Sequence, residues 1–350
     1  MDSLSEIFDV VIGVDTHVKT HSAAVVNAHT GGVLGEITVE ATPQGYDELV
    51  EFASEHEGLR AWAVEGTGSH GAGLTRRLAK TDELVVELDR PERQKRRNGA
   101  KSDPLDAIRA AREALSRAKL GTPRTTGERQ ALSVLLAARR SAVAAAIEAR
   151  QQLFALVIAA PEPLRAKLRG KRTLAMAQTA ARFRVQAEWD LETRTTAGVL
   201  RDLARRAIEL WAEADRHEKE ILGIVRAWRP DLLERKGVGP IVAATVLCAW
   251  SHPGRVHSEA AFAKLGGVAP IPANSGQVTT HYRLSRFGDR QLNLAFHTVV
   301  LSRIRWDEET QAYVKRRTAE GKTPREIKRC LKRYVAREFF RLLESVPSVT

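Results

Sequence analysis

The N-terminal quarter of the chain alternates short apolar runs with turn signals. The runs cover residues 8–15, 22–26, 33–40, 61–65 and 84–88, and each has the length and composition of a β-strand. Residues 44–56 and 71–80 carry a helical pattern instead. Strands followed by a strand–helix–strand order predict a mixed α/β sheet.

Long helices are expected from about residue 128. One apolar stripe with steps of three and four runs from Leu132 to Ala160, and another runs from Leu200 to Ile224. Arg139 interrupts the first stripe and His217 the second. The pattern predicts either an antiparallel coiled-coil arm or two amphipathic helices packed on a globular core.

The last part of the chain, residues 230–345, combines turns with a basic helical segment. Residues 315–341 hold eleven Lys or Arg against three Glu. Residues 233–243 read as a helix, a glycine hairpin and a helix, which either presents backbone N–H groups to a phosphate or is a plain connection. We therefore expect an α/β domain over residues 1–125, a helical arm over 126–229 and a mainly α-helical domain over 230–350.

The amino-acid composition indicates a polyanionic partner. The 350 residues include 55 Lys and Arg against 43 Asp and Glu, a net charge of +12, which favours nucleic acid over a merely basic surface. Cys248 and Cys330 lie far apart, outside any zinc or disulfide spacing. The N-terminus is acidic, and no uninterrupted apolar run approaches the ~18 residues that span a bilayer. We expect a cytoplasmic protein without a membrane partner.

Four carboxylates stand where the expected elements begin or end. Asp15 and Glu65 each end a strand, while Asp103 and Asp106 flank Pro104, which suits a first helical turn. If these acids converge, two of them ~4 Å apart repel by roughly 4 kcal/mol at an effective dielectric of ~20. Hard carboxylate oxygens suit Mg²⁺, and two such ions can stabilise both oxygens of a phosphodiester exchange. Each acid alone could equally be a helix cap, a turn residue or a solvated strand end.

Together with their neighbours, these acids resemble a known family. The motifs are Gly13-Val14-Asp15-Thr16-His17, Val64-Glu65-Gly66-Thr67-Gly68-Ser69 and Arg96-Arg97-Asn98-Gly99-Ala100-Lys101-Ser102-Asp103-Pro104-Leu105-Asp106. They are similar to the DEDD transposases of bacterial insertion sequences, the Piv/MooV group or IS110 family. The resemblance covers nearly the whole chain. It implies an RNase H-like first domain similar to the RuvC junction resolvase, with Asp15, Glu65, Asp103 and Asp106 binding Mg²⁺, or Mn²⁺ as a substitute.

The same resemblance extends to a serine near the C-terminus. Residues 266–276 and 284–293 are similar to the family's transposase domain, in which the serine of a Ser-Gly pair is the nucleophile, so Ser275 takes that role here. Taken alone, Ser275-Gly276 is a turn dipeptide. Asn274 replaces a small hydroxyl residue that often precedes the serine, which puts a supporting hydroxyl in doubt. No Ser-His-Asp signature is present, so the general base is unassigned.

Basic residues flank both candidate sites. Arg90, Arg93, Lys95, Arg96, Arg97 and Lys101 precede the second pair of acids with no aromatic residue among them. This favours phosphate contact over base stacking, against a solvated loop as the alternative. His281, Arg283, Arg286 and Arg290 follow the serine as phosphate clamps or supporting groups, or as ordinary surface and cap residues.

The leading interpretation is a recombinase that moves its own insertion sequence by Mg²⁺-dependent strand transfer through a phosphoserine DNA intermediate. The resemblance implies double-stranded DNA at the element ends and target, a structured guide RNA, a dimer or tetramer, and a place in the bacterial cytoplasm with the nucleoid. A structure-selective endonuclease that hydrolyses branched DNA with the tetrad alone is the alternative. A nucleic-acid scaffold without chemistry would fit the charge but not the acids.

Overall fold

The computed structural model describes residues 4–88, 103–272, 282–284 and 288–345. The chain divides into two compact units, Met1–Thr126 and Gly127–Thr350. The first is an α/β unit and the second is mostly helical, so the predicted order of fold classes is confirmed.

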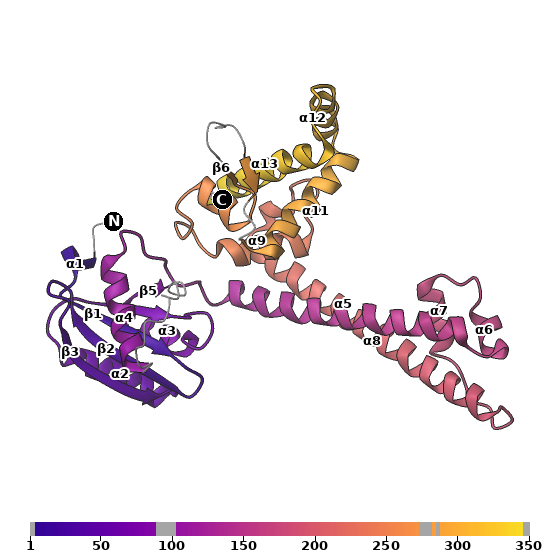
Figure 1. Ribbon diagram of the computed structural model, residues 1–350, viewed down its shortest axis with the longest axis horizontal. Helices are drawn as coiled ribbons and strands as arrows, with labels where there is room; N and C mark the ends of the chain where they lie inside the picture. The colour runs from indigo at the N-terminus through magenta and orange to yellow at the C-terminus, as the bar shows by residue number, and fades with distance from the viewer. Residues whose placement is uncertain (1–3, 89–102, 273–281, 285–287, 346–350) are drawn as a thin grey trace. The chain divides into compact units, whose positions relative to one another are not determined.

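The first unit is built on one five-stranded sheet (Figure 1). Its strands are β1 (Val10–Thr16), β2 (Thr20–Asn27), β3 (Val33–Glu40), β4 (Arg60–Glu65) and β5 (Leu84–Leu88), in the spatial order β3-β2-β1-β4-β5. β1 pairs with β2, and β2 with β3, in antiparallel fashion, whereas β1, β4 and β5 are parallel. All five predicted strands form, and the sheet is mixed.

Helices cover both faces of this sheet because successive strand residues point to opposite sides. α2 (Pro43–Ser54) and α3 (Ala72–Leu78) bury Leu49 and Leu74 against Ile12 and Trp62 on one face. α4 (Asp103–Ser116) covers the other face, together with the short α1 (Leu4–Ile7). The three-layer arrangement brings the start of α4 to the sheet, which positions the acids described below.

The second unit begins with two long helices that pack against each other, α5 (Glu128–Ala159) and α8 (Leu191–Trp228). Many of their buried residues are alanines, such as Ala146 and Ala207. Arg139, the polar residue in the first apolar stripe, donates to Glu218 of α8 with Nη2 2.7 Å from Oε2. The interruption in the stripe is therefore an ion pair between the two helices.

The two ends of this helix pair belong to different cores. At one end, Leu153 and Leu200 pack with α6 (Glu162–Leu168) and α7 (Thr173–Ala180). At the other end, Leu132, Ile221 and Val225 join the core of the C-terminal helices. The two helices therefore pack on each other, and the end that holds Leu132 and Val225 packs on the core of the C-terminal helices.

By length and composition, α5 is the one helix among the described residues that could cross a membrane, with a mean hydropathy of 1.4 over 18 residues. Its last turns bury Leu153 and Val157 against neighbouring helices instead. Glu148 and Arg150 also lie in this part of the helix.

α9 (Pro240–Trp250) is apolar and mostly buried, and it packs on α5, α8 and α11 (Arg290–Trp306). α10 (Glu259–Leu265) and α13 (Pro324–Glu344) belong to the same core, and α12 (Glu308–Ala319) packs on α11 and α13. Phe262, Phe296 and Phe339 form the centre of their core, with ring centroids about 6 Å apart. A two-stranded hairpin of β6 (Pro270–Pro272) and β7 (Tyr282–Leu284) stands between α10 and α11 in the chain.

Two local predictions need correction. The basic segment 315–341 is not one helix, because α12 ends before Gly321 (φ +78°) and α13 starts anew. Thr323 is the N-cap of α13 and forms a capping box with Glu326, and Pro324 is the first residue of the helix. The segment ahead of the glycine hairpin is a 3₁₀ turn, η1 (Pro230–Leu232), and not an α-helix. The chain turns there because buried Arg229 leaves the helical conformation and binds Asp231.

Candidate active site

Asp15 and Glu65 end two neighbouring parallel strands. β1 and β4 run in register up to the pair Val14 and Val64, so the next residues, Asp15 and Glu65, are neighbours at the same edge. The Thr16 hydroxyl donates to the Glu65 carbonyl oxygen at 2.9 Å and ties the two strand ends together. The Asp15 side chain is only 13% exposed. Two acids of the predicted tetrad therefore lie side by side.

Gly13 lets α4 approach this edge. A Cβ atom on Gly13 would lie 2.1 Å from the carbonyl oxygen of Ala107 and 2.5 Å from the backbone nitrogen of Ala111. Val11, two residues earlier on β1, shares a core cluster with Ala111 and Ala114. Residues of β1 that are nearer to Asp15 therefore lie against residues of α4 that are nearer to its N-terminus. Because Asp15 and Glu65 follow Gly13 and Ala63 by two residues, both carboxylates are on the face that α4 covers.

The second pair of acids belongs to the start of α4. Asp103 is its first residue, although only its backbone is described. Asp106 precedes Ala107 and accepts a hydrogen bond from Nη1 of Arg109 at 2.7 Å. Arg109 is largely exposed, and such ion pairs contribute little to stability. The Asp106 carboxylate can therefore turn away from Arg109 at small cost.

A divalent cation suits this set of donors. Asp15, Glu65 and Asp106 supply carboxylate oxygens, the preferred ligands of hard cations, from one end of the sheet. Among the residues that the structure describes, no three acidic, histidine or cysteine side chains are close enough to hold a metal ion together. The donor types and their common edge fit a metal, and closure around it requires side-chain rotation.

Two histidines adjoin the acids. Nε2 of His17 lies 3.4 Å from Oδ2 of Asp15. His21 is fully buried, stacks on Tyr46 with ring centroids 5.6 Å apart, and donates from Nδ1 to the Thr20 carbonyl at 2.9 Å. Burial lowers the pKa of His21 below its usual value. His21 is thus a neutral core residue beneath the edge of the sheet.

Glu87 is a further acid near this edge that the sequence reasoning missed. Its Oε1 accepts from the buried hydroxyl of Thr67 at 2.7 Å, just after Glu65 in the chain. Glu87 pairs with Val64, whereas Glu65 points to the opposite face. The bond therefore holds the turn that follows Glu65. A lone acid inside the apolar run of residues 84–88 was the available signal.

Several predicted residues lie outside the described part of the chain: Arg90, Arg93, Lys95, Arg96, Arg97, Lys101, Asn274, Ser275, His281 and Arg286. For Arg283 the structure gives only the backbone, within β7. Arg290 is exposed and is the first residue of α11. The acids and the serine belong to different units.

The two ends of the segment that contains Ser275 are held together by glycine contacts. Gly288 has φ +140°, and a Cβ there would lie 2.8 Å from the backbone nitrogen of Gly267. The Asp289 amide donates to the Leu265 carbonyl at 2.7 Å. A Cβ on Gly266 would lie 2.4 Å from the ring of Phe296. Any larger residue at these glycines would open the base of the hairpin.

Asn293 secures the same base from α11. Its Nδ2 donates to the Gly266 carbonyl at 2.7 Å, and its Oδ1 accepts from Nζ of Lys332 at 2.9 Å. Burial, and then the charge of Arg329, lower the pKa of Lys332. His297 follows one turn later, and its buried Nδ1 has no hydrogen-bond partner among the described residues. No pattern in the sequence pointed to this cluster, because Asn293 and Lys332 belong to separate helices.

Two protein-family models match this chain, one over the region of the acids and one over the region of the hairpin. A transposase model of DEDD type from the IS110 group matches residues 12–159. A model of the transposase IS116/IS110/IS902 family matches residues 230–315. A search of curated proteins found no match. The two matched segments contain every one of the four acids and the hairpin between α10 and α11.

Proposed function

Because the chain belongs to the IS110 family of DEDD transposases, we propose that it excises and inserts its own insertion sequence through a phosphoserine DNA intermediate. Membership makes it a DNA-transposing enzyme that binds DNA and depends on a divalent metal.

The metal half of the proposal assigns Asp15, Glu65, Asp103 and Asp106 as ligands of Mg²⁺, with Mn²⁺ as a substitute. The observation that carries it is the parallel register of β1 and β4 beneath α4. When bound, the metal would stabilise negative charge on the attacking and leaving oxygens of the phosphodiester. The chain itself keeps the ligands in place through Thr16 and Thr67, which tie the strand ends and the following turn. The mixed sheet with helices on both faces supports an RNase H-like assignment for residues 1–125.

The serine half assigns Ser275 as the nucleophile. Its Oγ attacks a DNA phosphorus, the serine loses its proton to a base, and the bond from phosphorus to one strand's oxygen breaks. That strand leaves as a hydroxyl, and a new strand's hydroxyl later displaces the serine. A serine hydroxyl is a weak nucleophile, and it reacts faster when the protein holds it in position. The glycine contacts and Asn293 at the base of the hairpin support this assignment.

Phosphate contacts are assigned to two groups of cations: Arg93, Lys95, Arg96, Arg97 and Lys101 ahead of α4, and Arg283, Arg286 and Arg290 at the hairpin. The net charge of +12 supports double-stranded DNA and a structured guide RNA as partners. A dimer or tetramer would bring the serine of one protomer to the acids of another, with the α5 and α8 arm (residues 126–229) in the assembly and residues 230–350 as the transposase domain.

A structure-selective nuclease is the second candidate, since the unit that carries the acids is compact by itself. Hydrolysis would use the acids alone, with water in place of the serine. The two functions differ in one product: only the transposase forms a covalent link between protein and DNA.

Ser275→Ala tests this difference. With Mg²⁺ and an element-end duplex, the wild-type chain is expected to form a denaturation-resistant DNA adduct that maps to Ser275 by mass spectrometry. The variant loses adduct and strand joining but keeps DNA binding, because a single hydroxyl adds little to so basic a chain. Asp15→Asn is the matched control, which loses the adduct with Ser275 intact. Strand joining by Ser275→Ala would refute the serine mechanism, and cleavage without any adduct would favour the nuclease.

A further inference from the structure

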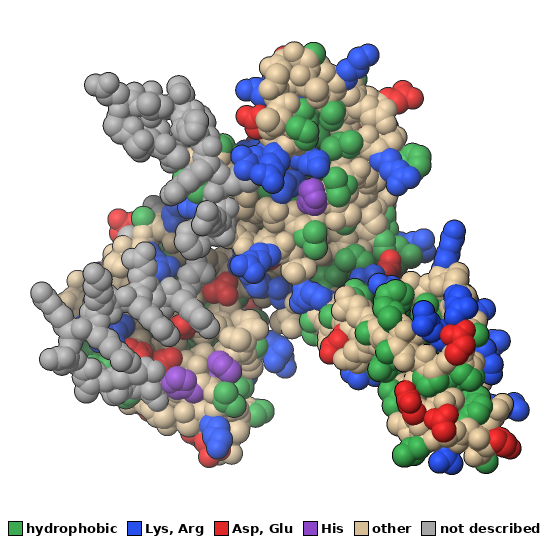
Figure 2. All heavy atoms as spheres, turned by 45° about the vertical axis from the view of Figure 1, so that its right-hand side comes forward, with side chains coloured by type: hydrophobic (Ala, Val, Ile, Leu, Met, Phe, Trp, Pro, Cys, Tyr) green, Lys and Arg blue, Asp and Glu red, His purple; other side chains and the backbone are tan. Residues whose placement is uncertain are grey.

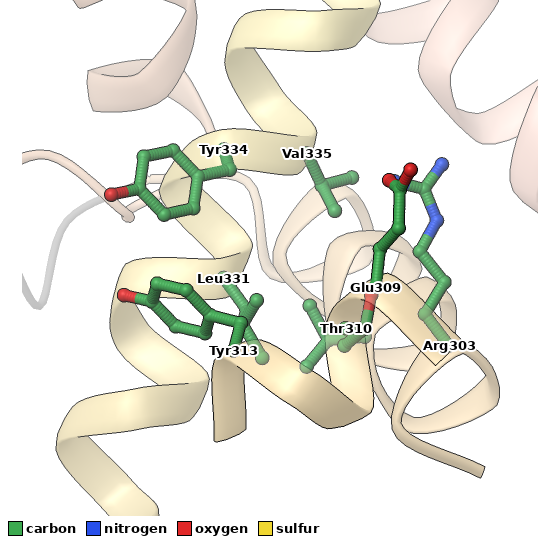
Figure 3. Close-up of a pocket in the computed structure, with 8 residues that line it drawn as sticks. Arg303, Glu309, Thr310, Tyr313, Leu331, Tyr334 and Val335 are labelled. Atoms are coloured by element: carbon green, nitrogen blue, oxygen red, sulfur yellow. The ribbon is translucent and has the colours of Figure 1, made fainter. Parts of the chain in front are cut away.

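Two tyrosines stand side by side where α11, α12 and α13 meet (Figure 3). They border a cavity of about 200 Å³ whose apolar side is formed by Val300, Leu331 and Val335. The rings of Tyr313 and Tyr334 meet edge to face, with centroids 5.8 Å apart and an angle of 86° between their planes. Glu309 and Arg303 lie on the opposite side of the cavity in Figure 3.

Tyr313 is the supporting ring of this pair. Arg316 and Arg317 lie 5.4 and 6.0 Å from its ring centre, within cation–π range. Burial, with contributions from Cys330 and Tyr334, raises the pKa of Tyr313 to about 12. Tyr334 is different, because 48% of it is exposed. Tyr334 therefore offers a rigid aromatic surface that another molecule can contact.

Tyr334 also lines a second cavity, of about 430 Å³. Its lining includes Arg235, Arg337, Arg341 and Glu338. The volume falls in the 300–1,000 Å³ range usual for small-molecule sites. Tyr334 is thus shared between an aromatic cavity and a cationic one.

The acids nearby do not neutralise these arginines. Glu259 is shared by Arg333, Arg337 and Arg341, at 2.7, 2.9 and 3.8 Å. The hydrogen bond from Arg337 is the main reason that the pKa of Glu259 lies below its usual value. Arg235 is exposed and has no ion pair within the described residues. The space-filling view shows Lys and Arg side chains gathered over the C-terminal helices (Figure 2). The surface therefore suits a polyanion.

An exposed aromatic ring between arginines suits one nucleotide of an unpaired strand. A base can stack on the ring while guanidinium groups bind the adjoining phosphates. A base inside a duplex is already stacked and has no free face for this contact. The carboxylate of Glu338 also lines this cavity, and its oxygens accept from Arg303 at 2.7 and 3.0 Å. A carboxylate oxygen has a second lone pair, which can accept a hydrogen bond from a ribose 2′-hydroxyl, a group that DNA lacks.

We propose that Tyr334, with Arg235, Arg337 and Arg341, binds an unpaired nucleotide of single-stranded RNA. This inference rests on the RNA partner proposed above and adds a site outside the acids and the serine hairpin. In this site Tyr334 stacks on the base, the arginines hold the phosphates, and Tyr313 fixes the orientation of Tyr334.

Fluorescence anisotropy of the full chain with a short, unstructured, fluorescein-labelled RNA tests the stacking contact. Tyr334→Ala is expected to raise the Kd about tenfold, the low end of the usual contribution of stacking one base. Tyr334→Phe keeps the ring and stays near wild type. Trp306→Ala is the matched control: Trp306 is 74% exposed with Arg305 over its ring at 4.8 Å, but it lines neither cavity.

The salt dependence of the same titration tests the phosphate contacts. Each phosphate of a single strand contributes roughly −0.7 to the slope of log K against log salt concentration. Arg235→Gln should therefore flatten the slope by about 0.7, whereas Tyr334→Ala should leave it unchanged. A cross-link from RNA containing 4-thiouridine should map to α13.

The outcomes separate this inference from the proposal on which it rests. If wild-type protein binds RNA and Tyr334→Ala binds it equally well, the site is refuted while the RNA partner stands. An equal loss with Trp306→Ala refutes a specific site. If the wild-type protein binds a single-stranded DNA of the same sequence as tightly as the RNA, the role of Glu338 is refuted. If wild-type protein binds no RNA, the RNA partner itself fails.

Discussion

The acid-bearing edge of the sheet and the basic C-terminal helices carry opposite charges and are held in opposite ways. Asp15 and Glu65 have short side chains, and the register of β1 and β4 determines where they lie. The arginines of α13 have long side chains, three of which share the single carboxylate of Glu259. A small cation needs ligands at defined positions, whereas a flexible polyanion is bound by many adaptable charges.

The comparison extends to the backbone. In the N-terminal unit, Gly13 allows a helix to lie directly on a strand, so the acids depend on one close approach. In the C-terminal helices, Gly266 and Gly288 close the base of the hairpin, which Asn293 and Lys332 then fasten. Both regions use glycine where another element must come near. The difference is that backbone register positions the acid edge, with the Thr16 and Thr67 hydroxyls as local ties, whereas side chains of two separate helices fasten the hairpin base.

The largest effect is expected from the acid edge. Asp15→Asn or Glu65→Gln should each lower strand cleavage at least about a hundredfold, because metal stabilisation of the reacting oxygens contributes several kcal/mol. DNA affinity should stay near wild type. Cleavage of a labelled element-end duplex in Mg²⁺ measures this, with Asp47→Asn, a surface acid paired with Arg77, as the control. Full activity in both acid variants would refute the metal site.

The next effect concerns binding and sharpens the contrast between fixed and distributed charge. Replacing Arg96, Arg97 and Lys101 with Ala should flatten the salt dependence of duplex DNA binding, by roughly 0.9 in the log–log slope for each phosphate that the variant no longer neutralises. Filter binding over a range of salt concentrations gives this slope. An unchanged slope would mean that these side chains contact no phosphate and that the segment is a solvated loop.

A smaller effect, on stability, is expected from Gly13→Ala. The added Cβ meets backbone atoms of α4, which cannot move alone, so overpacking should cost about 1–3 kcal/mol of unfolding free energy. Cleavage should fall as well, because α4 carries two of the acids. Urea denaturation compares it with Gly68→Ala, where a Cβ meets nothing within 4 Å. Equal stabilities would show that α4 does not depend on this contact.

The smallest effect is a dependence of stability on pH. The pKa of His21 is lowered by burial, so below the unfolded value of about 6.5 the unfolded chain binds more protons than the folded one. The stability contributed by neutral His21 is present above that pH and is lost as the pH falls toward its folded pKa. Between pH 7.5 and 5, His21→Phe should flatten the decline of the unfolding free energy while keeping an aromatic ring against Tyr46. His252 and His297, whose pKa values are also lowered, account for a remaining slope. An identical decline in the variant would exclude His21 as a contributor.

The sequence by itself determined most of the elements. Alternating and helical patterns depend on neighbours a few residues apart, so β3 and β5 begin and end at the predicted residues. The break between α12 and α13 also has a local cause, in Gly321, Thr323 and Pro324, which are signals that the count of basic residues does not include. Pro104 correctly marked the start of α4.

The sequence could not decide which distant residues meet. The positions of Asp15 beside Glu65, and of Asn293 beside Lys332, come from pairings between residues 50 and 39 positions apart in the chain. Nor could it distinguish Tyr334, with an exposed ring, from Tyr313, which is half-buried among cations. Local pattern sets the conformation of a segment, because that depends on its own backbone and neighbours. Which segments touch, and which side chains remain exposed, is decided only when burial of all the apolar faces is satisfied together.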